Sequence, residues 1–594
     1  MKSSIKKLSN YPLTVTSAVY IDNTKKNLSE FLKENIYDYS SKLLNYKGAF
    51  NYDNYTKNKN EGATGDYWTW EGDSIMDFDS CWIAYPGDIV YLDGEYFKTI
   101  HIPKTNNIQP KLKYDVCIIG GGAGGIGAAY ALKDAGYRVC IIERLDTLGG
   151  THCNCGISLL GTPICPWYKN VLEDGYNAGK ICFKNNNTDS NKTPVMVGDG
   201  DKFDKLYRGN QFTDHEKKVI NGFFGNYIEL NGVWFSEKYY NDFKNDIDVF
   251  INHELINTVS NAATKNVDYI TVKNLINGKE FDICADYFID CSGDAVLFTN
   301  DSNLTLDIDY YIGTDGRSRF NETVYTESEV PNKYGINTVE PTYYQVFRRY
   351  TSGYKFPDLP TKYKKYDNQV FKINGIMNIP GSNSNISIIS NSYGTRMSLE
   401  KFIDYPNSWN VADGYDRAKS LFINGSYTAG NRFAGITKML AIREKYRVAC
   451  EKTVDQNYLT TQITSSNYAD EHTIALSTWY VDIHNQSYSC VSNIANGVPY
   501  ESLIPKCYTN VLCGSRCYGA SHIGLSSIRL VKTMMDVGHS AGIAIKQLLD
   551  NNNRVDVRNV DVAQVQTEIG IADVIAELET YFYGSTVEFT TTTS

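Results

Sequence analysis

The stretch YDVCIIGGGAGG, residues 114–125, decides the fold of this chain. Its apolar first half is typical of a buried parallel strand, and the residues from Ile126 to Ala135 predict a helix after the glycines. Gly120, Gly122 and Gly125 stand where a dinucleotide-binding turn requires glycine. The first allows the tight turn, the second lets the backbone approach a pyrophosphate, and the third lets the helix pack on the strand. Amide groups at the helix start would then face the phosphates.

A second strand and an acidic residue follow at the spacing that this motif requires. Residues 138–142 predict a strand, and Glu143 stands at its end, 23 residues after Gly120. A carboxylate in this place can accept hydrogen bonds from the hydroxyl groups of an adenosine ribose. Strand, glycines, helix, strand and acid occur in the right order, so we predict a dinucleotide site that also includes Ala123, Gly124 and Arg144.

Composition and charge argue against several classes of protein. At roughly 100–200 residues per domain, 594 residues predict about three or four domains. The formal net charge of −10 argues against a nucleic-acid partner, because phosphate backbones favour basic surfaces. No apolar run approaches the ~18–20 residues of a membrane span, and the N-terminal residues lack the apolar stretch of a signal peptide. Without an export signal we expect reduced thiols, and because the 14 cysteines contain no C-x2-C pair we expect no metal site.

Further motifs show which dinucleotide is bound. They are the glycine pair in LGGT (148–151), the strand and turn ADYFIDCSGD (285–294), the strand and turn NVLCGSR (510–516) and the small-residue run GHSAG (538–542). This combination resembles the FAD-dependent oxidoreductases of the glutathione-reductase-like superfamily over about residues 112–550. The most specific parts of the resemblance are IRE (442–444) with Arg447, WYVDIH (479–484), PYESLIP (499–505), GSR (514–516) and SSIR (526–529).

The resemblance implies an α/β fold: a Rossmann-like FAD-binding domain with a β-rich α+β substrate domain, preceded by a small N-terminal helix plus β module. The predicted segments are an N-terminal accessory module (1–110), the first part of the FAD-binding domain (111–299, with a surface insertion at about 180–250), a substrate or cap domain (300–499), the second part of the FAD-binding domain (500–552) and a helical tail (553–594). We also expect a helix around Ala441 to Cys450.

The resemblance also places FAD on particular residues. Val259, which we expect just after a strand from Val249 to Asn257, is a predicted adenine contact. A helix beginning near His539 to Gly542 would point its N-terminus at the flavin pyrimidine and stabilise negative charge on the reduced ring. The other predicted cofactor contacts are Gly149, Gly150, Thr151, His152, Ser292, Gly293, Asp294, Gly514, Ser515, Arg516, Ser540, Ala541 and Gly542.

His152 has a second interpretation. It follows the glycine pair, where succinate-dehydrogenase-like flavoproteins carry a histidine bonded covalently to the flavin. The residues beside it, Thr151 and Cys153, do not match that motif well. A histidine that faces the flavin without a bond is therefore the expected arrangement, and covalent attachment is the alternative.

The chemistry requires a group that moves a proton while the flavin takes up hydride. His484, in Asp482-Ile483-His484, is the first candidate, and a structural histidine is the alternative. His522 and Arg529 come next, carried by the same family motifs. Arg516 and Arg443 are candidate clamps for a substrate carboxylate or for charge on the flavin, although structural ion pairs would equally explain two arginines.

The N-terminal segment differs from the rest of the chain. Apolar residues first recur at helical spacing, at Leu28, Leu32, Ile36, Tyr39 and Leu43. Alternating β-forming residues with Gly-Asp turns between them then predict a small β-module. This module resembles β-modules of phage tail fibres and other virion appendages, and similar patterns occur in carbohydrate-binding modules. An unrelated accessory domain is the alternative.

Two functions therefore stand as predictions. The first is an FAD-dependent oxidoreductase that transfers hydride from an unidentified small molecule to flavin, anchored to virion proteins or a surface glycan. The second is a structural or adhesive virion appendage protein that keeps the flavoprotein fold as a scaffold. We expect a homo-oligomer located in the virion, with the cytoplasm as the alternative, and neither a nucleic-acid nor a membrane partner.

Overall fold

The computed structural model describes only part of the chain, and all statements below concern that part. It falls into two compact units, Met1–Lys113 with Thr271–Cys284, and Tyr114–Ile270 with Ala285–Ser594. The described residues are 45–50, 66–70, 76–78, 82–84, 89–93, 96–100, 111–155, 159–161, 166–185, 195–196, 226–301, 308–312, 320, 322, 342–349, 372–378, 386–392, 431–436, 441–477, 481, 495–551 and 555–582.

The N-terminal part of the first unit contains a four-stranded sheet. Its order is β1 (Asn45–Phe50), β2 (Asp66–Trp70), β5 (Ile89–Asp93) and β6 (Tyr96–Ile100). A separate hairpin joins β3 (Met76–Phe78) to β4 (Trp82–Ala84). These strands fit the expected β-rich module, and the helix that we expected before it lies outside the described residues.

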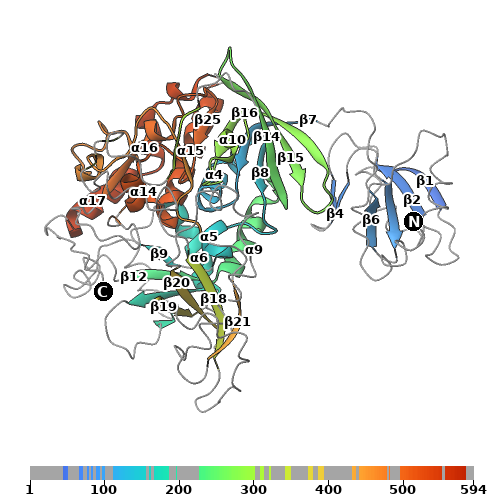
Figure 1. The fold of residues 1–594 in the computed structure, drawn as a ribbon, viewed down its shortest axis with the longest axis horizontal. Helices are drawn as coiled ribbons and strands as arrows, with labels where there is room; N and C mark the ends of the chain where they lie inside the picture. Colours follow the sequence, from blue (N-terminus) through green and yellow to red (C-terminus); the bar gives the residue numbers. More distant parts are fainter. Residues whose placement is uncertain are drawn as a thin grey trace, which may run out of the picture. The chain divides into compact units, whose positions relative to one another are not determined.

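The central sheet, most of whose residues belong to the second unit, has a parallel centre (Figure 1). The order is β13 (Ile247–Ile251), β8 (Val139–Glu143), β7 (Lys111–Ile119), β16 (Glu280–Asp290), β15 (Asn266–Asn274) and β14 (His253–Asn261), and β25 (Val511–Cys513) also pairs with β16. Strands β13, β8 and β7 are mutually parallel, as are β16 and β25. This arrangement confirms the Rossmann-like α/β fold.

Two helices pack against each other at very short range beside this sheet. They are α4 (Ala123–Leu132) and α15 (Val531–Asp550). A Cβ atom added to Gly127 would lie 2.0 Å from the carbonyl oxygen of Met535, and one added to Gly538 would lie 1.9 Å from that of Gly124. The prediction that a helix begins near His539 to Gly542 is wrong, because α15 already begins at Val531. The small residues permit this helix crossing and do not mark a helix start.

Three other expectations differ from the structure. Residues 441–450 are extended, with β22 (Tyr446–Val448) paired antiparallel to β17 (Tyr310–Ile312), so the helix expected there is wrong. The strand expected from Val249 to Asn257 is two strands, because Asn252 turns the chain at φ 57°. Val259 therefore lies inside β14. The end of segment 180–250 belongs to the core, since α9 (Gly232–Phe243) is packed inside and β13 pairs with β8.

None of the helices within the described ranges is both long and apolar enough to cross a membrane. The other helices are α5 (Gly150–Asn154), α6 (Lys169–Asn177), α10 (Val296–Thr299), α14 (His522–Ile528), α16 (Val562–Glu568) and α17 (Ile571–Phe582), with 3-10 turns at Pro166–Tyr168, Tyr458–Thr460, Tyr500–Leu503 and Val557–Asn559.

The remaining strands form three smaller sheets. One has the order β11 (Val195–Met196), β10 (Ile181–Asn185), β12 (Asn226–Leu230), β9 (Leu159–Gly161). The second has the order β19 (Lys372–Asn378), β20 (Ile386–Ser392), β18 (Thr342–Arg349), β21 (Asn431–Ile436). The third pairs β23 (Thr473–Ser477) with β24 (Asn496–Pro499).

Candidate functional site

The first glycine turn joins the end of β7 to α4. The amide of Gly120 donates to the carbonyl of Ile142 over 2.7 Å. A Cβ on Gly125 would lie 1.9 Å from the carbonyl oxygen of Gly120, and one on Gly124 would lie 2.1 Å from that of Gly514. Backbone packing within the protein alone therefore accounts for glycine at positions 124 and 125.

Gly122 is different, because none of the described residues makes a close contact that requires a glycine there. Among the described atoms, a Cβ on this residue would meet only the Cα atom of Gly150, at 3.9 Å. Gly122 is also the residue before α4, where no side chain caps the helix and no acidic residue lies in the first turn. Such a helix start presents amide groups and a positive dipole end, a combination that favours an anion.

Glu143 supports the glycine turn from the end of β8. Its carboxylate accepts hydrogen bonds from the amides of Gly121 and Leu145, each over 2.7 Å. Burial raises the pKa of Glu143, while these two amides act in the opposite direction. The acidic residue thus holds two loops, and Arg144 beside it points to Glu254 at 3.7 Å.

The second glycine pair lies directly on the first turn. The amide of Gly149 donates to the carbonyl of Gly121 over 2.7 Å, and a Cβ on Gly150 would lie 2.7 Å from the Cα atom of Gly122. Thr151 follows in the short helix α5. The two predicted loops are therefore brought together, with Gly122 at their meeting point.

A third turn follows β16 and is organised by a carboxylate that sequence reasoning missed. Asp290 is fully buried and accepts hydrogen bonds from the amide and the hydroxyl of Ser292 (2.9 and 2.6 Å) and from the amide of Leu297 (3.1 Å). Burial raises its pKa to about 6. The carbonyl of Asp290 also accepts the amide of Gly514 over 2.9 Å, which joins this turn to the end of β25.

Arg516 lies across the turn after β16. Its guanidinium donates to Asp294 over 3.0 Å and packs on Gly293, where an added Cβ would lie 2.7 Å from Cζ. Burial raises the pKa of the Cys155 thiol, and the charges of Arg516 and Arg443 offset only part of this rise. Arg443 lies in the extended segment just before β22, and Ser515 beside Arg516 is buried.

His152 lies inside an aromatic cluster. Its Nε2 atom is 3.0 Å from the hydroxyl of Tyr239, which in turn bonds the hydroxyl of Tyr168, and its buried Nδ1 atom has no hydrogen-bond partner among the described residues. Burial lowers its pKa to about 3, so the ring is neutral. The structure places His152 against Tyr239, and its position facing a flavin stays a prediction.

The other catalytic candidates have different surroundings. His522, the first residue of α14, is buried against Glu444, and Arg529 ends the same helix. His484 lies outside the described residues. Ser540 donates to the carbonyl of Ile474, Gly542 packs against α4, and Ala541 is buried in the same helix, so these three predicted contacts lie in the middle of α15.

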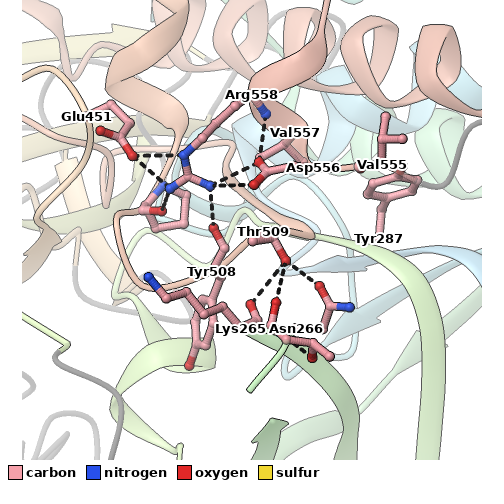
Figure 2. Close-up of polar contacts among 12 residues, drawn as sticks. Lys265, Asn266, Tyr287, Glu451, Tyr508, Thr509, Val555, Asp556, Val557 and Arg558 are labelled. Atoms are coloured by element: carbon pink, nitrogen blue, oxygen red, sulfur yellow. Dashed lines mark hydrogen bonds and ion pairs between the residues drawn. The ribbon is translucent and has the colours of Figure 1, made fainter. Parts of the chain in front are cut away.

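The strand that supplies Gly514 to Arg516 is held from outside by Arg558 (Figure 2). The Arg558 guanidinium donates to Glu451 through Nε and Nη2, to both carboxylate oxygens of Asp556, and to the carbonyls of Tyr508 and Pro505. These six bonds fix the segment just before β25. Across the described ranges, no group of three or more His, Cys, Asp or Glu side chains could hold a metal ion.

Similar curated proteins cover only short stretches of the chain. It is 51% identical over 53 residues to an uncharacterized protein of Acanthamoeba polyphaga mimivirus, covering 9% of this chain and 11% of that one. It is 58% identical over 47 residues to the soluble pyridine nucleotide transhydrogenase of Sodalis glossinidius (strain morsitans), covering 8% of this chain and 10% of that one. The chain thus spans about a tenth of the length of these curated relatives.

Solved structures give a broad but weak likeness. A myxobacterial chondrochloren halogenase, described as FAD-dependent, is 13% identical with a TM-score of 0.36 and coverage of 79% of this chain and 81% of that one. An anhydrotetracycline hydroxylase from Streptomyces rimosus is 11% identical with a TM-score of 0.36 and coverage of 79% and 69%. Likeness at this level assigns no reaction.

A family model decides the class of the chain. The model described as FAD dependent oxidoreductase matches residues 115–569 of the 594, a range that contains all three turns described above. The protein belongs to the FAD dependent oxidoreductase family, with FAD as its cofactor.

Proposed function

We propose that this protein takes hydride from a small-molecule substrate and passes it to FAD bound over the two glycine turns. The observation that carries the proposal is the space at Gly122. Its neighbours need glycine for packing within the protein, whereas in the described part of the chain a Cβ on Gly122 would meet only Gly150, at 3.9 Å. A glycine with open space at an uncapped helix start fits a bound pyrophosphate.

The residues around this space fit the other parts of FAD. Glu143 and the turn 149–151 lie beside the first turn and would hold the adenosine side, while Ser292 to Asp294 and Gly514 to Arg516 would hold the flavin side. FAD supplies the hydride chemistry when it is bound. Arg516, already paired with Asp294 over 3.0 Å, would keep its guanidinium beside developing negative charge.

Proton transfer is the task that remains for the side chains. We propose His484 and His522 as the groups that exchange a proton with the substrate, and Arg529, Arg443 and Arg516 as candidates for binding its anionic group. The support for Arg516 is its place beside the turn after β16, where its guanidinium pairs with Asp294 over 3.0 Å.

The scaffold hypothesis is not favoured. A protein that kept only the architecture would need glycine at 120, 124 and 125, where backbone atoms leave no room for a side chain, but it would not need one at 122. Retention of Gly122 beside an uncapped helix therefore supports a protein that binds its cofactor.

The N-terminal module suggests a place of action. We propose that residues 1–110 attach the enzyme to virion proteins or to a surface glycan, and that the protein is a homo-oligomer. The support is the Tyr- and Trp-rich sequence pattern of the module together with its small antiparallel strands β5 and β6. Deletion of residues 1–110 should abolish co-sedimentation with particles, or retention on a glycan array, and should preserve FAD binding.

The main experiment is identification of the cofactor and of its reduction. The purified full-length protein should carry one FAD per chain and show flavin absorbance that small-molecule donors bleach under anaerobic conditions. Protein purified under conditions that retain flavin, yet without absorbance, would contradict the proposal. FAD that no donor bleaches would support binding and reject the proposed hydride transfer.

A further inference from the structure

Glu444 and His522 form a carboxylate–imidazole pair inside the protein, although 78 residues separate them in the sequence. Nδ1 of His522 is 2.9 Å from Oε1 of Glu444 and 2.8 Å from Oε2. The exposed fraction of the His522 side chain is 1% and that of Glu444 is 0%. An ionised carboxylate only accepts hydrogen bonds, so the Nδ1 atom in this pair must carry the proton and donate.

Arg447 holds the carboxylate in place. Its Nη2 atom is 3.3 Å from Oε1 of Glu444, and its Nη1 atom donates to the carbonyl of Ala520 over 2.6 Å. A buried carboxylate is costly unless an opposite charge and hydrogen bonds compensate it. Arg447 supplies the charge, and its second bond ties Glu444 to the backbone just before His522.

The surroundings of His522 contain further charged groups. Ser521 caps α14 by accepting the amide of Gly524 over 3.0 Å, and its hydroxyl donates to Glu322. Within the described part of the chain, the charged side chains that these contacts bring to His522 are Glu444, Arg447 and, through Ser521, Glu322. The segments that carry Glu322, Glu444 and His522 thus meet at the start of α14.

We propose that Glu444 is a positioning residue that keeps a proton on Nδ1 of His522, so that His522 takes up and releases protons only at Nε2. The use of that proton exchange rests on the proposed function. A substrate that gives up a hydride also loses one proton, and Nε2 would accept this proton and return it to solvent. The two electrons leave with the hydride, so the imidazole changes its protonation and not its oxidation state.

The test is the 15N spectrum of the imidazole rings in the full-length protein. The chain has only eight histidines, and the signals missing from a His522→Gln variant identify His522. The expected result is a protonated Nδ1 at every pH at which the protein stays folded, with only the Nε2 signal changing with pH. A 15N signal showing that Nδ1 of His522 carries no proton would overturn the proposal. An Nε2 signal that never changes with pH would also overturn it, because that would indicate a purely structural histidine.

Variants test the role of the carboxylate itself. Glu444→Gln should convert His522 into a mixture of tautomers, because an amide can both donate and accept, and Glu444→Asp should restore a protonated Nδ1. Glu501→Gln is the matched control, since Glu501 pairs with Nδ1 of the more exposed His472. It should leave the His522 signals unchanged. A folded Glu444→Gln protein with an unchanged Nδ1 signal would reject the positioning role.

The measurement is independent of the cofactor. The wild-type spectrum decides the tautomer even if the Glu444→Gln protein does not fold. A protein that lacks FAD but has a protonated Nδ1 and a titrating Nε2 would contradict the proposed function and leave the positioning role standing. A protein that binds FAD but has an unprotonated Nδ1 on His522 would reject the positioning role and leave the proposed function standing.

Discussion

Gly293 and Arg516 are in direct contact: a Cβ atom built on Gly293 would lie 2.7 Å from Cζ of the guanidinium. Gly293 also has φ +71°, a left-handed conformation that side chains rarely adopt. The turn after β16 therefore accepts the arginine only because this residue has no side chain, and Arg516 can pair with Asp294 at the same time.

We predict that Gly293→Ala displaces Arg516 and weakens FAD binding about tenfold, roughly the loss of 1.4 kcal/mol. Gly278→Ala is the matched control, because Gly278 has φ +74° and no atom within 4 Å of the added Cβ. Both variants should lose similar thermal stability from backbone strain, so calorimetry and flavin titration together separate strain from displacement. Equal FAD affinity in the two variants would remove Arg516 from the cofactor site.

Gly122→Asp should abolish FAD binding without harming the fold. The new carboxylate would occupy the space beside Gly150 and repel a pyrophosphate, yet an aspartate before α4 is a favourable helix cap. We therefore expect a Tm equal to or above that of the FAD-free wild type, with an affinity for FAD at least ~100-fold lower. Gly278→Asp adds the same charge in an open turn and should bind FAD normally. Stoichiometric FAD in Gly122→Asp would refute the placement of the pyrophosphate.

The contact between α4 and α15 should tolerate no added side chain. In Gly538→Ala the new methyl group would lie 1.9 Å from the carbonyl oxygen of Gly124, and a backbone atom cannot move aside cheaply. We expect a loss of about 1–3 kcal/mol in the free energy of unfolding. Gly122→Ala serves as the control, since the nearest described atom to its Cβ is 3.9 Å away, and urea titration of both proteins in the FAD-free form makes the comparison. Similar stabilities would show that the two helices can separate without cost.

His539 should make the protein sensitive to acid. Its ring stacks on Trp167 at 4.6 Å, and burial lowers its pKa from 6.5 to about 3. Between these values the unfolded chain binds a proton that the folded chain does not. Stability is therefore present above pH 6.5 and is lost as the pH falls. From pH 6.5 to pH 5 this loss is about 2 kcal/mol.

His539→Phe keeps a ring against Trp167 and removes the titration. Between pH 7 and pH 5 the free energy of unfolding should fall in both proteins. The fall in the variant should be smaller than that in the wild type by about 2 kcal/mol. Urea denaturation at both pH values measures the difference. An identical pH dependence in the two proteins would assign the acid sensitivity to other groups.

Arg558→Lys should loosen the segment before β25. A lysine cannot reproduce the planar fork that reaches Glu451, Asp556 and two backbone carbonyls at once. Because the side chain is partly exposed, we expect a modest loss of about 1–2 kcal/mol, seen as a lower Tm. Lys133→Ala, which breaks the surface pair with Asp134, should change the Tm very little. A larger loss in the latter variant would contradict this ranking.

The glycine turns could be predicted from the sequence because their requirements are local. The run from Tyr114 to Gly125 contains the strand, the turn and the helix start within twelve consecutive residues. Glu143 was found in the same way, since its spacing from Gly120 is part of the motif. The spacing does not show that Glu143 accepts two backbone amides, because one of them comes from the other loop.

The errors arose where distant segments determine the local structure. Gly538 and Gly542 suggested a helix start, but they are small because α4 crosses α15 at those positions. Glu444 and Arg447 have helical spacing, yet their partners lie at His522 and Ala520, and the chain between them is extended. No feature of either segment alone reveals such pairing, and the same applies to the role of Asp290.

The two hydrogen bonds of Glu143 have a consequence for how a ligand is received. Because the carboxylate already joins Gly121 to Leu145 through hydrogen bonds, the binding site takes its shape when the protein folds and does not need the cofactor in order to form. The conformational entropy of the two loops is therefore lost during folding and not during binding. Ordering these loops then subtracts little from the binding free energy of the cofactor. The apoprotein should accordingly keep a preorganised site that rebinds the prosthetic group when it is added back.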